Sequence, residues 1–243
     1  MRIGLIAERY IDGDLDFNFF QMSRWLSDYS QQGCDLLCFG ESFAHGFEAL
    51  CWQQKHDIRI ALTQADKRIQ QLAKVARENE TGIGFGYIER EGRKLFSSYM
   101  VISSRGDLLF NFRRVSPGWK TSAADSGIYL EGSSYDCFQL NGKTIGAAIC
   151  GDLWHDDLLL KFNAQPSELL LWPLYVSYTP EYWYGGERDA YAQRVASLNR
   201  PVLMINSISD PPDQAFGGAY VFDSGRISQE LPLGQSGILM FES

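Results

Sequence analysis

Residues 142–157 read GKTIGAAICGDLWHDD and combine a turn, an apolar strand and a cysteine. Asn141 and Gly142 are a strong signal for a two-residue hairpin turn, so residues 135–140 and 143–149 are predicted to pair. The second of these strands leads directly to Cys150. Ligands in α/β proteins bind beyond the carboxyl ends of strands, which makes the Cys150 thiol a candidate nucleophile.

Strands and helices alternate in the outer thirds of the chain, whereas hairpins dominate the middle. One helix is expected after Asp14, which can cap it, and another over residues 63–79, where Thr63 and Asp66 resemble a capping box. This order favours an α/β layered fold with a mixed sheet, or two sheets with helices outside. A third helix is expected at residues 187–199, and further strands at residues 3–7, 35–39, 82–88, 98–103, 108–112, 167–172, 201–207, 220–223 and 227–231.

The composition is that of a globular protein, with 243 residues of which 45% are hydrophobic and 21% charged. Without an internal repeat or a linker-like stretch, residues 1–243 are interpreted as one domain. A net charge of −8 and a pI near 4.9 make nucleic acid and anionic membrane surfaces poor partners. The first residues lack a signal-peptide core and no apolar stretch is long enough to span a membrane, so a cytoplasmic location is expected.

The sequence offers no pattern typical of a cofactor or metal site. Five cysteines occur at irregular spacing, and an odd number in a chain of this length favours reduced thiols. Without a CxxC pair or an HxxxH pattern, no metal site is expected. No phosphate loop or dinucleotide fingerprint is present, so no organic cofactor is expected.

Three polar residues each follow or end an apolar strand: Glu41 ends DLLCFGE, Arg114 ends LLFNFRR and Cys150 ends TIGAAIC. Convergence at one sheet edge would place a carboxylate, a cation and a thiol around one pocket. The carboxylate can take the thiol proton and later protonate a leaving amine, while the cation stabilises an oxyanion. Taken singly, the three have plainer interpretations, as a loop carboxylate, a solvated charge and an inert buried thiol.

The order of these segments resembles the nitrilase superfamily, the carbon–nitrogen hydrolases. LLCFGESFAHGF is similar to the family's Glu segment, with Glu41 in that place. GKTIGAAICGDLWHDD is similar to the nucleophile segment, with Cys150 and the Asp two positions on, Asp152. FGYIEREGRKLFSSYMVISSRGDLLFNFRRV resembles the paired strands leading to the family's Lys, where this chain has Arg114. LLLWPLYV, VLMINS and GGAYVFDSGRI resemble later segments, so the similarity covers nearly the whole chain.

The resemblance implies a four-layer αββα sandwich with two mixed β-sheets and outer helices, often paired into a homodimer or higher homo-oligomer. It also implies a second carboxylate, for which Asp125 is best placed by its spacing from Gly132 and Glu131 is the other candidate. Arg114 in the Lys place can still hold an oxyanion, but it is bulkier and cannot give up its proton. Lys120 can substitute only if the loop over residues 116–134 folds back.

The resulting hypothesis is a thiol-dependent hydrolase of a small amide, carbamoyl or nitrile carbon. Cys150 forms a thioester, Glu41 is the general base, Arg114 supplies positive charge and Asp125 or Glu131 supports proton transfer. The alternative is a catalytically impaired relative that binds a small molecule or a partner in the same pocket.

Substrate-binding residues are predicted among acidic and aromatic side chains near the later strands. Large aromatics more often fill a core or an interface, which is the plainer interpretation of several of them. The candidates are Asp152, Trp154, Trp172 and Tyr175, with Trp119 and Trp183 as further aromatics. A Cys–His enzyme using His155 or His45 is disfavoured, because no orienting Asn or Asp is identifiable.

Overall fold

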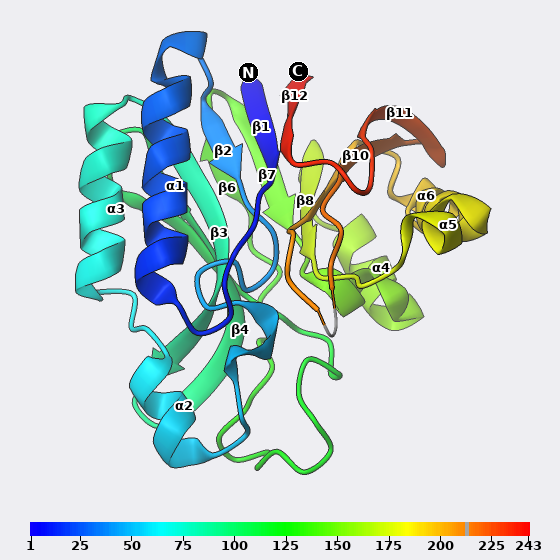
Figure 1. Cartoon of the computed structure of the whole chain (residues 1–243). Helices are drawn as coiled ribbons and strands as arrows, with labels where there is room; N and C mark the ends of the chain where they lie inside the picture. The colour runs from blue at the N-terminus through cyan, green and yellow to red at the C-terminus, as the bar shows by residue number, and fades with distance from the viewer. Residues whose placement is uncertain (212–213) are drawn as a thin grey trace.

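Two six-stranded β-sheets make up the centre of the computed structural model, which describes residues 1–211 and 214–243 (Figure 1). The first sheet has the order β12 (Gly237–Glu242), β1 (Arg2–Ala7), β2 (Leu36–Cys38), β3 (Gly82–Glu91), β4 (Lys94–Ile102) and β5 (Leu108–Arg113). The second has the order β11 (Arg226–Leu231), β10 (Ala219–Asp223), β9 (Val202–Asn206), β8 (Leu169–Leu174), β7 (Lys143–Ala147) and β6 (Phe138–Leu140).

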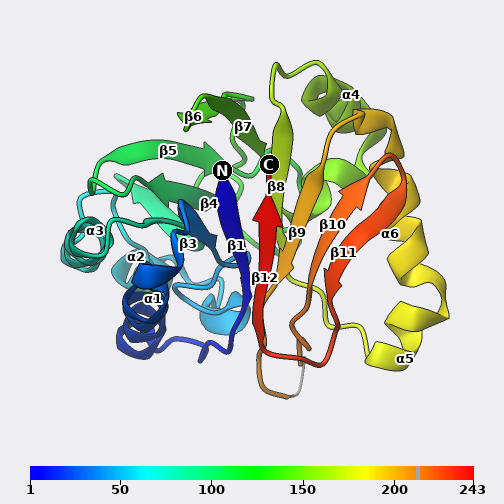
Figure 2. The same ribbon diagram turned by 90° about the horizontal axis from the view of Figure 1, so that it is seen from above.

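Helices cover the outer faces of the two sheets, as Figure 2 shows. Outside the first sheet lie α1 (Leu15–Tyr29) and α3 (Lys67–Glu78), whereas α2 (Gln54–Ile60) lies beyond the lower end of that sheet in Figure 1. Outside the second lie α4 (Asp156–Asn163), α5 (Pro180–Tyr182) and α6 (Arg188–Arg194). This arrangement confirms the predicted αββα sandwich with two mixed sheets. Among the described residues, no helix combines the length and apolar character that crossing a membrane requires.

Alternation along the inner strands separates two apolar cores. In β1, Ile3 and Leu5 belong to the core that also contains Leu171 of β8. Ile6, one position further, belongs instead to the core that contains Met22 of α1. Because successive strand side chains point to opposite faces, the first core fills the space between the sheets and continues beneath α4 and α6, and the second lies beneath α1 and α3.

Strand direction brings the predicted site residues toward one edge. β1, β2 and β3 pair in parallel, and β5 is antiparallel to β4, which is antiparallel to β3. The carboxyl ends of β2 and β5 therefore lie at the same edge of the first sheet, followed by Glu41 and Arg114 respectively. β7, β8 and β9 pair in parallel in the second sheet, and Cys150 follows β7.

Helix boundaries were only partly predicted. Asp14 caps α1 as predicted, because its side chain accepts a hydrogen bond from Phe17 N at 3.0 Å. The predicted helix start at Thr63 is wrong: α3 begins at Lys67, and Asp66 is its N-cap. Here residues 63–66 form a turn in front of the helix, with Asp66 N donating to the carbonyl of Thr63.

Later elements also depart from the predicted ranges. The helix predicted over residues 187–199 is too long, because α6 stops at Arg194 and Asn199 adopts a left-handed φ of 51°. β7 ends at Ala147, and Cys150 opens a short 3₁₀ turn, Cys150–Trp154, beyond the strand. The sequence did not predict α2, α4 or β12.

Candidate active site

The loop after β2 holds Glu41 against β3 because Gly86 leaves room for its backbone. A Cβ atom on Gly86 would lie 2.3 Å from the backbone nitrogen of Ser42, and Gly86 N donates to the carbonyl of Gly40 at 3.1 Å. The chain therefore turns directly over the strand, and the Glu41 side chain is only 2% exposed. A buried carboxylate needs a partner, and the next strand to end at this edge supplies it.

Arg114 is that partner. Its Nη1 donates to Oε1 of Glu41 at 2.9 Å, and its Nε donates to Oγ of Ser116 at 2.9 Å. Ser97 donates a longer hydrogen bond of 3.4 Å to the same Glu41 oxygen. Burial alone would lower the pKa of Arg114, but nearby negative charge, chiefly that of Glu41, outweighs it and raises the pKa. The guanidinium therefore stays charged.

Arg113 and Arg114 point in different directions. Arg113 pairs with Glu89 at 2.7 Å and Glu91 at 3.1 Å, and its guanidinium lies 3.9 Å from the ring centroid of Phe96. Neighbouring side chains at a strand end alternate between faces, so only the second arginine of the pair reaches Glu41.

Cys150 has an uncommon backbone conformation, with a left-handed φ of 42°. Its carbonyl accepts a hydrogen bond from Trp172 Nε1 at 2.8 Å, and its Sγ lies 3.9 Å from the carbonyl oxygen of Tyr175. Gly151 follows, and a Cβ atom there would lie 2.5 Å from Nη2 of Arg114. The turn therefore brings the backbone beside the thiol close to the guanidinium.

The charges of Glu41 and Arg114 both affect the pKa of the Cys150 thiol. Its pKa is raised to about 12, chiefly by burial and also by the charge of Glu41, while the charge of Arg114 opposes the shift. The resting thiol is therefore protonated at neutral pH. Glu41 Oε2 is buried and has no hydrogen-bond partner among the described residues, so this oxygen is available to accept a proton.

The side chain of Asp152, two residues after Cys150, is fully buried. Its Oδ1 accepts from the backbone nitrogens of Val115 at 3.1 Å and Ser116 at 2.7 Å, and its Oδ2 accepts from that of Ile149 at 2.8 Å. Burial raises the pKa of Asp152 despite the opposing charge of Arg114. The sequence assigned this residue to substrate binding, but its contacts join the segment after β5 to the turn that carries Cys150.

A cavity of about 40 Å³ opens beside Glu41. Its polar lining comes from Glu41, Ser42, Glu48 and Ser97, and its apolar lining from Phe47, Leu50, Trp52, Ile88 and Trp119. Trp119 was among the predicted aromatics, whereas Phe47, Trp52 and Ser97 were not identified. Ser97 is next to Ser98, which pairs with Arg113 across β4 and β5, so only the strand register could have identified it.

The other predicted aromatics do not line this cavity directly. Trp172 and Trp183 are fully buried, and Trp154 is 41% exposed at the surface. Tyr175 stacks on Phe47, with ring centroids 4.1 Å apart, and so supports one wall of the cavity.

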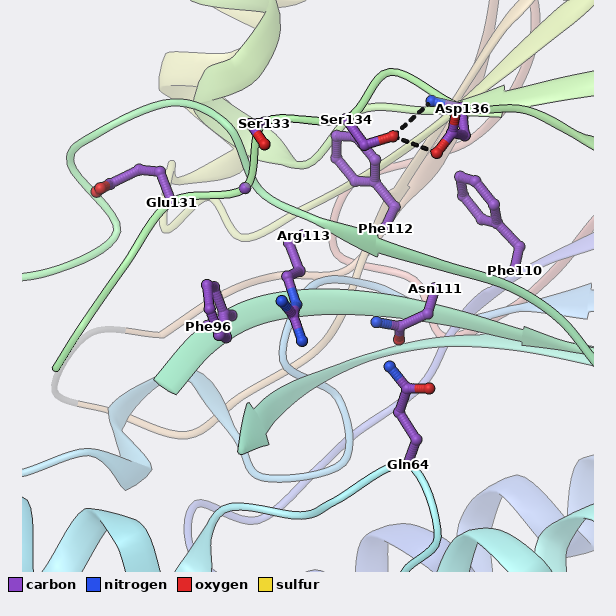
Figure 3. Close-up of a pocket in the computed structure, with 11 residues that line it drawn as sticks. Gln64, Phe96, Phe110, Asn111, Phe112, Arg113, Glu131, Ser133, Ser134 and Asp136 are labelled. Carbon is purple, nitrogen blue, oxygen red and sulfur yellow. Dashed lines mark hydrogen bonds between the residues drawn. The ribbon is translucent and has the colours of Figure 1, made fainter. Parts of the chain in front are cut away.

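Neither candidate for the second carboxylate lines the cavity beside Glu41. Asp125 is exposed, accepts a hydrogen bond from Gly127 N at 2.8 Å and lines a different cavity. Glu131 pairs with Lys120 at 2.7 Å and lines a third cavity of about 300 Å³, together with Arg113. Figure 3 shows this third cavity, with the Glu131 carboxylate directed away from Arg113.

The histidines are not placed to act on the thiol. His45 is buried, its Nδ1 accepts from Ile88 N at 3.1 Å and its Nε2 lies 3.0 Å from the carbonyl oxygen of Ile60. Burial lowers the pKa of His45 to about 4, so the ring is neutral at pH 7. His155 is exposed in front of α4. These positions disfavour a Cys–His mechanism.

Comparison with known proteins shows which family and which sequences this chain resembles. The family model described as Carbon-nitrogen hydrolase matches residues 7–238. An aliphatic nitrilase from Rhodococcus rhodochrous is 23% identical over 197 residues, which cover 74% of this chain and 52% of the nitrilase. A nitrilase from Alcaligenes faecalis, described as arylacetone-specific, is 25% identical over 62% of this chain and 45% of its own length. This chain thus spans about half the length of these curated relatives.

Solved structures share the fold at low sequence identity. A mutant of the Nesterenkonia AN1 amidase, from the nitrilase superfamily, has a TM-score of 0.79 and 17% identity over 99% of this chain and 89% of its own. A glutamine-dependent NAD+ synthetase from Acinetobacter baumannii has a TM-score of 0.78 and 18% identity, covering 98% of this chain and 44% of the synthetase. Another structure of the Nesterenkonia amidase shows acrylamide added to the active site cysteine of that enzyme.

Proposed function

Since the chain belongs to the carbon–nitrogen hydrolase family, we propose that it hydrolyses a small non-peptide C–N bond through a thioester on Cys150. The substrate class is an amide, a carbamoyl compound or a nitrile. The observation that carries the proposal is the buried pair of Glu41 and Arg114, whose charges both act on the Cys150 thiol. A nucleophile, a proton acceptor and a cation therefore serve one site.

For an amide, Sγ of Cys150 attacks the carbonyl carbon while Glu41 Oε2 takes the thiol proton. Because the pKa of the thiol is raised, proton transfer accompanies attack instead of preceding it. The new S–C bond leaves a negative oxygen, which the charge of Arg114 stabilises. The C–N bond then breaks as Glu41 returns the proton to the leaving amine.

Water completes the cycle by attacking the thioester. Glu41 takes a proton from this water, the C–S bond breaks, and the proton passes to Sγ. The products are a carboxylic acid and an amine or ammonia, so the reaction consumes one water for each amide. The cavity of about 40 Å³ beside Glu41 favours substrates with few heavy atoms.

A binding protein without turnover is the second candidate, and the same ion pair favours it. Arg114 cannot give up its proton and occupies Oε1 of Glu41, which leaves a single carboxylate oxygen for proton transfer. Asp125 and Glu131, the predicted second carboxylates, both lie on other cavities. In this case Arg114→Lys would confer amidase activity on an otherwise silent protein.

The test offers the protein short-chain amides and nitriles. Ammonia release measures turnover, and intact mass spectrometry of the protein detects a covalent acyl group. A slow substrate should leave an acyl group on Cys150 of the wild-type chain. Cys150→Ala should release no ammonia and gain no mass, whereas Cys137→Ser, a control at another partly buried thiol, should behave as wild type. Undiminished turnover by Cys150→Ala would disprove the thioester mechanism, and a silent wild type would favour the binding role.

The predicted homodimer or higher homo-oligomer stays a prediction. Light scattering of the purified protein tests it directly, because the mass of a dimer is twice the 27.5 kDa of the chain.

A further inference from the structure

A second group of reactive side chains lies at the start of α2, outside the proposed reaction. It consists of Cys51, His56 and Asp57. Oδ1 of Asp57 is 3.4 Å from Sγ of Cys51 and 3.0 Å from Nδ1 of His56. One ligand atom from each residue lies within 4.8 Å of the other two. A thiol, an imidazole and a carboxylate thus meet around one point.

We propose that these three residues bind a divalent zinc ion. In tetrahedral zinc sites the metal–ligand distances are about 2.0–2.3 Å, which places neighbouring ligand atoms about 3.3–3.6 Å apart. The separations of 3.4 Å and 3.0 Å lie close to this range, whereas the third pair, Cys51 and His56, lies within 4.8 Å and must close to this range when the ion binds. Thiolate and imidazole ligands favour zinc over magnesium or calcium, which prefer oxygen.

A hydrogen bond fixes the Asp57 carboxylate, while the other two ligands are accessible to solvent. Asp57 is fully buried, and its second oxygen, Oδ2, accepts a hydrogen bond from the Tyr129 hydroxyl at 2.5 Å. Such an outer partner fixes the orientation of a metal-binding carboxylate, so that Oδ1, which also accepts from Cys51 N at 3.2 Å, faces the other two ligands. Cys51 is exposed and the His56 side chain is 45% exposed, so an ion and a water as fourth ligand can reach the site from solvent.

Charge and protons balance when the ion binds. The Cys51 thiol donates a hydrogen bond to Asp57, and zinc replaces its proton, which is released to solvent. Nδ1 of His56, which donates to Asp57 Oδ1, binds the ion after its proton has moved to Nε2, so the ring stays neutral. The thiolate and the carboxylate then offset the two positive charges of the ion.

The proposed zinc site differs from the expectation drawn from the sequence. No metal site was expected there, because the sequence contains no CxxC or HxxxH pattern. The spacing in Cys51-x₄-His56-Asp57 becomes meaningful only because a loop and the first turn of α2 bring the residues together. The site also adjoins the proposed substrate cavity, because Trp52 follows Cys51 and lines that cavity.

The first experiment titrates the metal-free protein with Co²⁺ as a spectroscopic probe and then adds Zn²⁺. One Co²⁺ per chain should bind with a sulfur-to-cobalt charge-transfer band, and Zn²⁺ should abolish the band. Cys51→Ser should lose the band, and His56→Ala, which removes a direct ligand, should weaken Co²⁺ affinity by at least the roughly 10–100-fold that loss of an outer partner costs. Cys137→Ser and His155→Ala are the matched controls and should bind as wild type.

A second measurement uses only the wild-type protein, so it does not depend on folding of the variants. Iodoacetamide labelling is followed by peptide mass spectrometry with and without Zn²⁺. Zinc should protect Cys51 and leave Cys137 unprotected. Absence of the charge-transfer band in wild type, its survival in Cys51→Ser, or zinc protection of Cys150 in place of Cys51 would each overturn the proposal.

Discussion

Nη1 of Arg114 lies 2.9 Å from Oε1 of Glu41, and the two side chains are only 5% and 2% exposed. The pair is therefore shielded from water, and each charge depends on the other. Removing one partner of a buried pair leaves an uncompensated charge, whereas removing both is much less costly. This relationship governs stability as well as the proposed chemistry.

Arg114→Met should lower the free energy of unfolding by about 3–5 kcal/mol, because it leaves Glu41 buried without its cation. The double variant Glu41→Gln/Arg114→Met should recover much of this loss, since neither charge remains. Urea unfolding of the wild type and of both variants measures the effect. Equal stability of the single and double variants would show that the two residues are not energetically coupled.

Glu41→Gln should change turnover and thiol reactivity in opposite directions. Loss of the general base should lower kcat by roughly 10²–10⁴-fold. Loss of the negative charge should also lower the pKa of Cys150 from about 12, so alkylation at pH 8 should become faster. Peptide mass spectrometry with iodoacetamide measures this rate, with Cys137 as the internal control. Slower alkylation of Cys150 in this variant would contradict the assigned electrostatics.

Gly151→Ala should disturb the site, because the new Cβ atom would lie 2.5 Å from Nη2 of Arg114. The guanidinium must then move, and a displacement near the reacting atoms costs roughly 10²-fold in rate. Gly185→Ala is the matched control, since a Cβ atom there meets nothing within 4 Å. The test compares kcat/KM and urea unfolding for the two variants. Equal rates would mean that the guanidinium adapts without cost.

His45 should make the protein less stable in mild acid. Its pKa is lowered to about 4 in the folded state, against an ordinary value of 6.5 in the unfolded chain. Between these values the unfolded state binds the extra proton, so stability falls as the pH drops from about 6.5 to 4 and this contribution then levels off. The loss at pH 5 should be about 2 kcal/mol.

His45→Gln cannot take up that proton, so its stability should change less between pH 7 and pH 5 than that of the wild type. His155→Gln, at an exposed position, should keep the wild-type pH dependence. Urea unfolding at pH 7 and pH 5 measures this change in stability for the wild type and both variants. A wild-type curve that does not move between pH 7 and pH 5 would rule out a buried neutral His45.

The sequence predicted the layered fold well, because apolar strands and helix caps are local signals. It also placed Glu41 and Arg114 at ends of strands that meet at one edge, and the structure joins them in an ion pair. The catalytic roles of these residues and of Cys150 stay predictions. β12 was not predicted, since it pairs with β1 across nearly the whole length of the chain and local patterns do not mark such pairing.

Loop side chains were the hardest to place. The spacing from Gly132 suggested Asp125 as a site residue, but spacing does not fix where a loop side chain points. Asp125 instead accepts a hydrogen bond from Gly127 within its own turn. Ser116 was not identified either. Its part in the site is to accept a hydrogen bond from Arg114, and only the folded loop brings the two side chains together.

The three backbone hydrogen bonds that Asp152 accepts have a consequence for how this scaffold can diversify. One carboxylate joins the segment after Arg114 to the turn around Cys150, so these two reactive groups stand on one hydrogen-bonded floor. The walls, in contrast, come from Phe47 and Trp52 in the segment between β2 and α2 and from Trp119 in the segment after β5. Substituting smaller side chains there should widen the range of acceptable molecules while the floor keeps its alignment.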